Sequence, residues 1–168
     1  DFYYNNEDVT FIFNPEYPQE SIAFSDSEEN KLYRNYLGDI SKAQQSLDSI
    51  QIAFLQDPSL NLADVYKSAY SNLNKVQVKY DKLTKNRYIA PVISASLRVN
   101  SPTILNSVDA YLSSIKATFF ERLDFSNKTL RNSSFLTNRT LDYIFYINYS
   151  DDLVEQQKLY KKSVNTVL

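Results

Sequence analysis

The side chains that could carry chemistry in this chain are carboxylates, amines and phenols, because cysteine and histidine are both absent. Without those two residue types the chain has no thiol nucleophile, no imidazole base and none of the usual zinc ligands. A loop that cradles a phosphate with backbone N–H groups needs several glycines, and Gly38 is the only glycine. Composition alone therefore argues against thiol chemistry, imidazole catalysis, structural zinc and nucleotide binding by such a loop.

Two pairs of adjacent carboxylates, Glu28-Glu29 and Asp151-Asp152, could hold a divalent cation. Both pairs stand where a helix is expected to begin, and acidic side chains in a first turn are stabilised by the helix dipole, so we interpret both as structural. A glycosidase-type carboxylate pair could be assembled from residues such as Glu121 and Asp124, but nothing in the sequence singles them out. We predict no catalytic, cofactor-binding or metal-binding residue in this chain, and no cofactor.

Charge is segregated along the chain. The first thirty residues carry a charge of −8 with no base, so the remaining residues carry +6 to give the net charge of −2. The acids of this N-terminal stretch are Asp1, Glu7, Asp8, Glu16, Glu20, Asp26, Glu28 and Glu29. Six bases fall between Lys67 and Arg87, against the single acid Asp81.

One interpretation of this basic stretch is a helix that binds nucleic acid and stacks its tyrosines on the bases. Those tyrosines are Tyr66, Tyr70, Tyr80 and Tyr88. The interpretation we favour is that the acidic arm lies near the basic helix, or that both are solvated, while the tyrosines pack in the core. We therefore expect a protein partner and no nucleic acid.

The element that must organise the chain is the stretch 27–56, which has the pattern of one long helix. Apolar residues recur there in steps of three and four, the spacing of a single buried face. They are Leu32, Tyr36, Ile40, Ala43, Leu47, Ile50 and Phe54. Ser25 and Ser27 are candidate caps, Glu28 would complete a capping box with Ser25, and Pro58 ends the run. At roughly 1.5 Å per residue this helix is about 45 Å long, so other helices must pack along it.

More helices are expected downstream. The second is capped by Asn61, buries a stripe from Leu62 to Leu83, and pairs with the first as an antiparallel hairpin. The others are expected at 86–98, from 102 or 107 to 122, at 135–147, and after a cap at Ser150, with a tight turn at 127–130. The expected buried stripe of the last helix is Leu153, Gln157, Tyr160, Val164 and Val167.

Before the long helix, residues 2–4 and the alternating residues 9–13 predict a β-hairpin around a polar turn at 5–8. Residues 21–24 are a candidate for a further extended piece. The fold class is therefore mainly α, an antiparallel helical bundle of about six helices with a short N-terminal β-hairpin. We assign 1–24 as a hairpin and extended arm that ends an upstream β-domain, and 25–168 as the helical domain.

The chain has no methionine and opens in a strand-like stretch, so we expect it to be a piece of a longer protein. No stretch approaches the roughly 20 apolar residues of a membrane span. Four Asn-x-Ser/Thr sequons occur, at Asn127, Asn132, Asn138 and Asn148. Asn, Ser and Thr are abundant enough for most of these to arise by chance, so they do not by themselves indicate a glycoprotein.

Three segments resemble a known family. Residues 14–16 with 27–37 are similar to the step from an N-terminal β-domain into a long helix, and residues 80–97 to the following link, although the usual proline near Asn86 is absent. Residues 119–126, Phe-Phe-Glu-Arg-Leu-Asp-Phe-Ser, followed by 130–132, resemble an aromatic, Asp-Phe-Ser, Leu-Leu-Arg-Thr pattern. All three occur upstream of the thioredoxin fold in extracytoplasmic thiol:disulfide oxidoreductases of the Bacteroidetes, often called thioredoxin-like or AhpC/TSA-type lipoproteins.

The resemblance implies an exported envelope protein, periplasmic or outer-membrane associated and lipid-anchored. A β-domain would precede this helical part and a thioredoxin domain would follow it. The Cys-x-x-Cys of the family is not in these residues, so no catalytic role transfers to any position and we expect this chain not to be an enzyme. We expect a non-catalytic scaffold or interaction module of such an oxidoreductase. The alternative is a free-standing structural or adaptor subunit of a bacterial envelope complex, and a homodimer is among the candidate partners.

Overall fold

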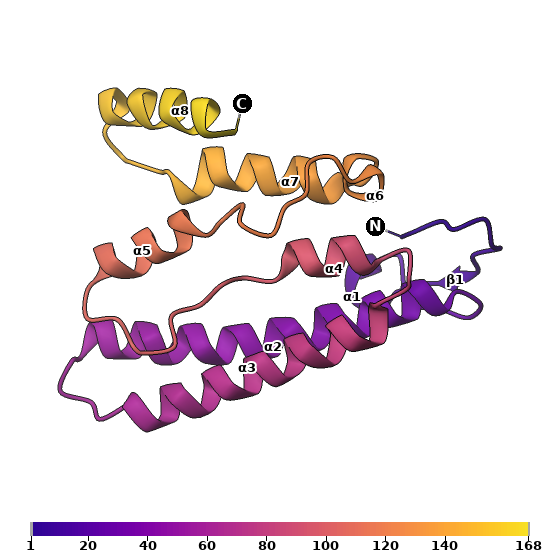
Figure 1. Cartoon of the computed structure of the whole chain (residues 1–168), viewed down its shortest axis with the longest axis horizontal. Coiled ribbons are helices and arrows are strands. Elements are labelled where there is room, and N and C mark those ends of the chain that lie inside the picture. The colour runs from indigo at the N-terminus through magenta and orange to yellow at the C-terminus, as the bar shows by residue number, and fades with distance from the viewer. Residues whose placement is uncertain (1, 168) are drawn as a thin grey trace.

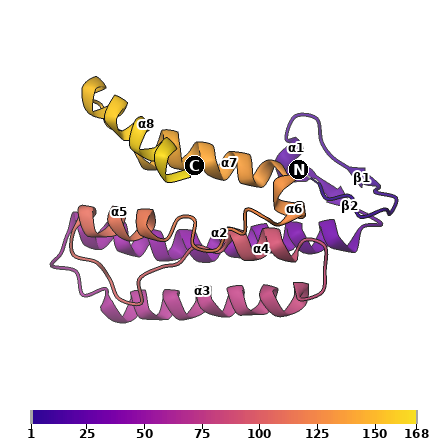
Figure 2. The same cartoon turned by 45° about the horizontal axis from the view of Figure 1, so that its top comes forward.

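The structure is a computed structural model that describes residues 2–167, apart from the side chains of Gln19 and Val167, and it is mainly helical. A short antiparallel two-stranded sheet lies near the N-terminus, so the predicted fold class is confirmed. The helices form three layers (Figures 1 and 2), with α3 (Ala63–Thr84) outermost, then α2 (Glu28–Gln56) with α4 (Ala90–Ser96) and α5 (Val108–Ala117), and finally α7 (Ser134–Asp142) with α8 (Leu153–Val167).

The long helix α2 begins one residue after its cap, Ser27, whose side chain accepts a hydrogen bond from the Asn30 N–H at 3.3 Å. The predicted capping box between Ser25 and Glu28 is wrong, because the Ser25 hydroxyl donates instead to the Thr10 carbonyl at 3.3 Å. The helix ends at Gln56, as predicted from Pro58. Apart from this shift of the cap, the sequence located the helix correctly.

Helices α2 and α3 lie side by side and antiparallel, as predicted (Figure 1). Their seam contains the buried cluster Ala43, Leu47, Tyr66 and Leu73. The predicted cap Asn61 is wrong, since α3 starts after Leu62 without a side-chain cap. At the other end Leu83 is 49% exposed and Thr84 is buried in its place. The Thr84 hydroxyl donates to the Tyr80 carbonyl at 2.7 Å, which satisfies it inside the core.

The third and fourth predicted helices are present but shorter. Helix α4 covers 90–96 because Leu97 takes an extended conformation, with φ −66° and ψ 122°. The chain then runs back along α2 as an irregular segment, residues 97–107, before Ser107 caps α5 by accepting from the Ala110 N–H at 3.1 Å. Helix α5 ends at Ala117, short of the predicted residue 122, because Thr118 leaves the helical region.

The C-terminal part departs most from prediction. The turn expected at 127–130 is a short helix, α6 (Lys128–Arg131), capped by Asn127, and α7 continues into a π-helical turn, η1 (Tyr143–Ile147). The cap of α8 is Asp152 and not Ser150, since its carboxylate accepts from the Glu155 N–H at 2.8 Å.

The predicted buried stripe of α8 is also wrong. Leu153 is 79% exposed and Val164 is 42% exposed, whereas Gln156 and Ser163 are buried. Asn148 explains this orientation, because its side-chain amide donates to Ser163 Oγ at 2.9 Å and its carbonyl accepts from the Gln156 amide at 3.1 Å. Val167, the last member of the predicted stripe, has a side chain outside the described part.

The N-terminal hairpin pairs different strands from those predicted. Strand β1 (Phe11–Ile12) pairs with β2 (Ala23–Phe24), with the short α1 (Pro18–Ser21) between them. Residues 2–4 are not a strand, because Asn30 takes the place of a partner strand for Tyr3. Its side chain accepts from the Tyr3 N–H and donates to the Tyr3 carbonyl, both at 2.7 Å, and buries Tyr3 in the helical core.

Candidate polar site and interaction surfaces

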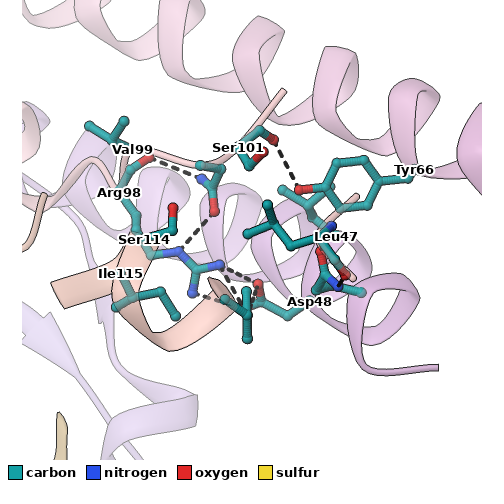
Figure 3. Close-up of a pocket in the computed structure, with 12 residues that line it drawn as sticks. Leu47, Asp48, Tyr66, Arg98, Val99, Ser101, Ser114 and Ile115 are labelled. Carbon is teal, nitrogen blue, oxygen red and sulfur yellow. Dashed lines mark hydrogen bonds and ion pairs between the residues drawn. The ribbon is translucent and has the colours of Figure 1, made fainter. Parts of the chain in front are cut away.

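A polar cluster links α2, the segment after α4, and α5. The Arg98 guanidinium forms a two-pronged ion pair with the carboxylate of Asp48, with Nη1 at 3.1 Å from Oδ2 and Nη2 bonded to Oδ1. The Tyr111 hydroxyl donates to the same carboxylate at 2.9 Å. Figure 3 shows Arg98 reaching toward Asp48 from the segment that crosses α2.

The same segment is fixed to α2 and α3 by further side chains. The Gln51 side-chain amide donates to the Leu105 carbonyl at 2.7 Å and accepts from the Leu105 N–H at 2.9 Å, which satisfies both backbone polar groups of this residue. The Tyr66 hydroxyl donates to the Ser101 carbonyl at 3.0 Å (Figure 3). An irregular segment inside a protein needs such partners, because it lacks the hydrogen bonds of a helix.

The electrostatics of the cluster keep its phenols protonated. Burial raises the pKa of Tyr66 to about 12, and the neighbouring Tyr111 adds to the shift. Burial is also the main cause that raises the pKa of Tyr111. At neutral pH both hydroxyls therefore remain hydrogen-bond donors, and neither is poised to act as a base.

The space inside this cluster is about 10 Å³, close to the room of one water molecule. A substrate does not fit, and the charged groups already hold one another. The geometry can therefore clamp residues 97–107 onto the α2 and α3 hairpin. Sequence reasoning missed this cluster, because Asp48 and Arg98 are 50 positions apart.

The carboxylate pairs considered from the sequence stand at helix starts, as expected. Glu28 forms an exposed ion pair with Lys31 at 2.9 Å. Glu29 is buried, and its carboxylate accepts from the N–H groups of Tyr88 at 3.4 Å and Ile89 at 3.2 Å, which caps the start of α4. Within residues 2–167 no three metal-ligating side chains gather into a group that could hold an ion.

Three of the other acids considered as chemical groups, Asp124, Asp151 and Asp152, serve turns and caps. Asp152 caps α8, and Asp151 accepts from the Tyr149 hydroxyl at 2.7 Å. Asp124 accepts from both the N–H and the hydroxyl of Ser126, at 2.9 Å and 2.6 Å, and these bonds lower its pKa. Glu121 is exposed. These contacts hold local backbone conformations.

An open basin of about 560 Å³ lies between the end of α3, α4 and residues 122–130. Its charged side chains are Lys82, Lys85 and Arg122 against Asp81 and Asp124. Charges of both signs on an open surface do not define a site for one ion, and we assign it no ligand.

Arg139 is a partly buried cation on α7. Its guanidinium carbon lies 3.8 Å from the centre of the Phe119 ring, and Nη2 donates to the Phe119 carbonyl at 3.2 Å. Its Nε is buried and has no hydrogen-bond partner among the described residues, and burial lowers the pKa of the group. The cation–π contact with the Phe119 ring offsets part of the free-energy cost of burying the guanidinium. Arg139 therefore anchors α7 on the turn after α5.

The tyrosines of α3 do not all face solvent. Tyr66 and Tyr80 are 4% and 1% exposed, so neither can stack on a nucleic-acid base, and the prediction of core packing is confirmed for these two. Tyr70 and Tyr88 are only partly buried, each packed against a core cluster. The Tyr80 hydroxyl donates to Asp39 at 2.8 Å, and Lys79 pairs with the same carboxylate at 2.8 Å.

Four lysines of α3 and its C-cap form one exposed row, which we call the lysine stripe: Lys67, Lys75, Lys82 and Lys85. Steps of eight, seven and three residues return to the same side of a helix. Val78 lies in the same row and is 52% exposed. The positions of these lysines in the sequence already imply a common side of the helix, but a count of the bases alone does not reveal that alignment.

Residues 2–26, which we call the acidic arm, combine negative charge with exposed apolar side chains. The arm carries Glu7, Asp8, Glu16, Glu20 and Asp26 and no base. Its exposed apolar side chains are Phe2, Tyr4, Phe11, Ile12, Phe13 and Tyr17, with exposed fractions from 39% to 73%. This is the kind of surface that marks a protein contact.

The four sequons differ in whether their amide nitrogen is free to be modified. Asn148 is buried, and its Nδ2 donates to the Tyr143 carbonyl at 3.1 Å as well as to Ser163. N-glycosylation uses this nitrogen, so it would have to displace α8 from the folded chain. Asn132 and Asn138 are exposed, and Asn127 is half-buried at the α6 cap.

Between residues 2 and 167 the structure has no helix with the length and apolarity needed to cross a bilayer. Comparison with protein-family models found no match, and comparisons with curated proteins and with solved structures also found none.

Proposed function

We propose that this chain is a non-catalytic helical scaffold and interaction module. The observation that carries the proposal is the Asp48, Arg98 and Tyr111 cluster, whose polar groups hold one another around room for a single water molecule. A catalytic site keeps a charged or nucleophilic group available beside space for a substrate. Here the ion pair instead clamps a long connection, which is a structural task.

The parent protein in this proposal is an extracytoplasmic thiol:disulfide oxidoreductase of the thioredoxin-like type, periplasmic or outer-membrane associated. The partners of the module are then a β-domain before it and a thioredoxin domain after it. Support comes from the sequence resemblance over residues 14–37, 80–97 and 119–132. The absence of cysteine is compatible with a place beside a disulfide-exchanging domain, since such a module cannot be cross-linked in error.

The test of this assignment is the DNA that follows the codon for Leu168. We expect the reading frame to continue into a strand and helix that carry Cys-x-x-Cys. Fractionation of the native host should place the full product in the cell envelope. A stop codon directly after Leu168, or a cytosolic product, would overturn the oxidoreductase assignment.

The second candidate is a free-standing adaptor subunit of an envelope complex. The exposed aromatic side chains of the acidic arm favour it, because large apolar groups at a surface are typical of protein contacts. Isolation of the tagged native protein with a stoichiometric partner of different sequence would support this function. Isolation of the protein alone would contradict it.

A further inference from the structure

We infer that the chain binds a second copy of itself, with the acidic arm of one copy on the lysine stripe of the other. This inference goes beyond the scaffold function proposed above and does not depend on a redox domain. It is carried by two surfaces of opposite charge that the fold keeps apart.

The lysine stripe is a positive surface whose amines are free of ion pairs among residues 2–167, although Lys82 and Lys85 border the basin that Asp81 and Asp124 also line. From Lys67 to Lys85 it extends about 27 Å along α3, at roughly 1.5 Å per residue. None of its four amines lies in an ion pair with a described residue, whereas Lys79 on the neighbouring face pairs with Asp39. The helix also carries Asp64 and Asp81, and neither pairs with the stripe.

The acidic arm is a negative surface without ion pairs among the described residues, and the guanidinium of Arg34 that touches it donates to the Glu20 backbone carbonyl at 2.7 Å and not to a carboxylate. Its five carboxylates form no ion pair with any residue in the described range. Glu7 accepts only from the Ser27 hydroxyl, at 2.8 Å, and Asp26 only from the Ser25 hydroxyl, at 3.4 Å. Asp8, Glu16 and Glu20 are exposed.

The two surfaces cannot meet within one chain as it is folded. Figure 2 shows the arm and α3 on opposite sides of α2. Tyr3 is held to Asn30 by two hydrogen bonds of 2.7 Å, and β2 packs against α2, so the arm is fixed on its side. The charges must therefore find their complement in solvent or on another molecule.

A second copy supplies both complements at once. Each copy offers one arm and one stripe, so two copies related by a two-fold axis can make the same contact twice. Both surfaces also expose apolar side chains, with Ile12 73% and Val78 52% exposed. Contact between two copies would remove these side chains from water, which favours association. The net charge of −2 gives little repulsion between copies.

The test is the molar mass of the full chain by sedimentation velocity over a concentration series, at low and at high salt. We expect a dimer at low salt that dissociates as salt screens the contact. Replacing Lys67, Lys75 and Lys82 by Glu leaves the stripe with three carboxylates and one amine, and replacing Asp8, Glu16 and Glu20 by Lys leaves the arm with three amines and two carboxylates. Each set of three should weaken the dimer at least about tenfold, because surfaces of the same sign then face each other.

The decisive variant carries all six replacements. Its arm is then net basic and its stripe net acidic, so attraction returns and the dimer should re-form within about threefold of the original affinity. The matched control replaces Lys158, Lys161 and Lys162 on α8 by Glu, which changes the charge as much as the stripe variant but lies on neither surface and should leave the dimer unchanged. Circular dichroism checks that every variant keeps its helices.

A monomer at every concentration would overturn the inference. A dimer whose affinity is unchanged by the charge reversals, or is not restored when they are combined, would also overturn it. A different outcome is a monomer that binds a short DNA duplex and no longer binds it after the three replacements in the stripe. That result would assign the stripe to nucleic-acid binding instead. The continuation of the gene past Leu168 does not enter this experiment. Failure here therefore leaves the proposed scaffold function standing.

Discussion

The two ends of the helical fold are held by opposite chemistries. The hairpin of α2 and α3 is closed by apolar side chains, with Leu47 and Leu73 at 1% and 0% exposed. The contact of α8 with η1 is instead closed by Asn148, Gln156 and Ser163. An apolar seam needs only shape and area, whereas a polar seam holds only if each buried group finds its partner.

The first prediction removes apolar volume from the strong seam. Leu47→Ala should lower the free energy of unfolding by about 2 to 5 kcal/mol, because it loses buried area and leaves a cavity. Urea unfolding followed by circular dichroism measures the loss. Leu83→Ala on the same hairpin is the matched control, since Leu83 is 49% exposed, and it should cost less than about 0.5 kcal/mol. Equal losses in the two variants would contradict this description of the seam.

The same contrast explains which parts of the fold could be predicted from sequence. The α2 stripe places Tyr36, Ala43 and Leu47 in the core because its apolar period matches its buried face. In α8 the apolar period predicted that Leu153 and Val164 are buried, but both are exposed. The buried face there is polar, and its partner Asn148 directly follows the π-helical turn, where the chain turns more widely than in an α-helix.

The polar cluster and the N-terminal arm were unpredictable for a related reason. The pairing of Asp48 with Arg98 depends on the path of residues 97–107, and no local pattern encodes that path. Likewise, alternation along residues 2–13 is compatible with a hairpin, but Asn30 supplies a closer partner for Tyr3. Long-range hydrogen bonds decided both cases, and they depend on tertiary structure that a local pattern cannot supply.

The second prediction weakens the clamp that ties the irregular segment to the apolar hairpin. Asp48→Asn keeps the shape but removes the charge opposite Arg98, and it should cost about 2 to 3 kcal/mol because a partly buried guanidinium loses its counterion. Hydrogen exchange should show faster opening of residues 97–107. Asp81→Asn, at an exposed position near the end of α3 and in no ion pair with a described residue, is the control and should change neither quantity. Unchanged exchange in the Asp48 variant would show that the clamp does not hold the segment.

The third prediction breaks the polar seam. Asn148→Ala removes the donors to Tyr143 and Ser163 and should cost about 1 to 2 kcal/mol. We expect this loss to appear as local opening of α8, with hydrogen exchange there accelerated about tenfold while α2 and α3 keep their protection. Asn165→Ala, at an exposed position of the same helix, should leave the exchange unchanged. Equal acceleration throughout the chain would show that the two ends unfold as one unit.

The smallest effect concerns alkaline pH, and it belongs to the apolar end. Burial raises the pKa of Tyr66 and of Tyr36 to about 12, above the value near 10 of an unfolded chain. Between these values the folded state holds protons that the unfolded state has lost, so this contribution is complete below about pH 10 and disappears as the pH rises toward 12. Tyr66→Phe should reduce the slope of stability against pH in that window, whereas Tyr146→Phe, at a position 75% exposed, should not. Urea midpoints at several pH values measure both slopes. Identical slopes would mean that the Tyr66 hydroxyl is not held by burial in the seam.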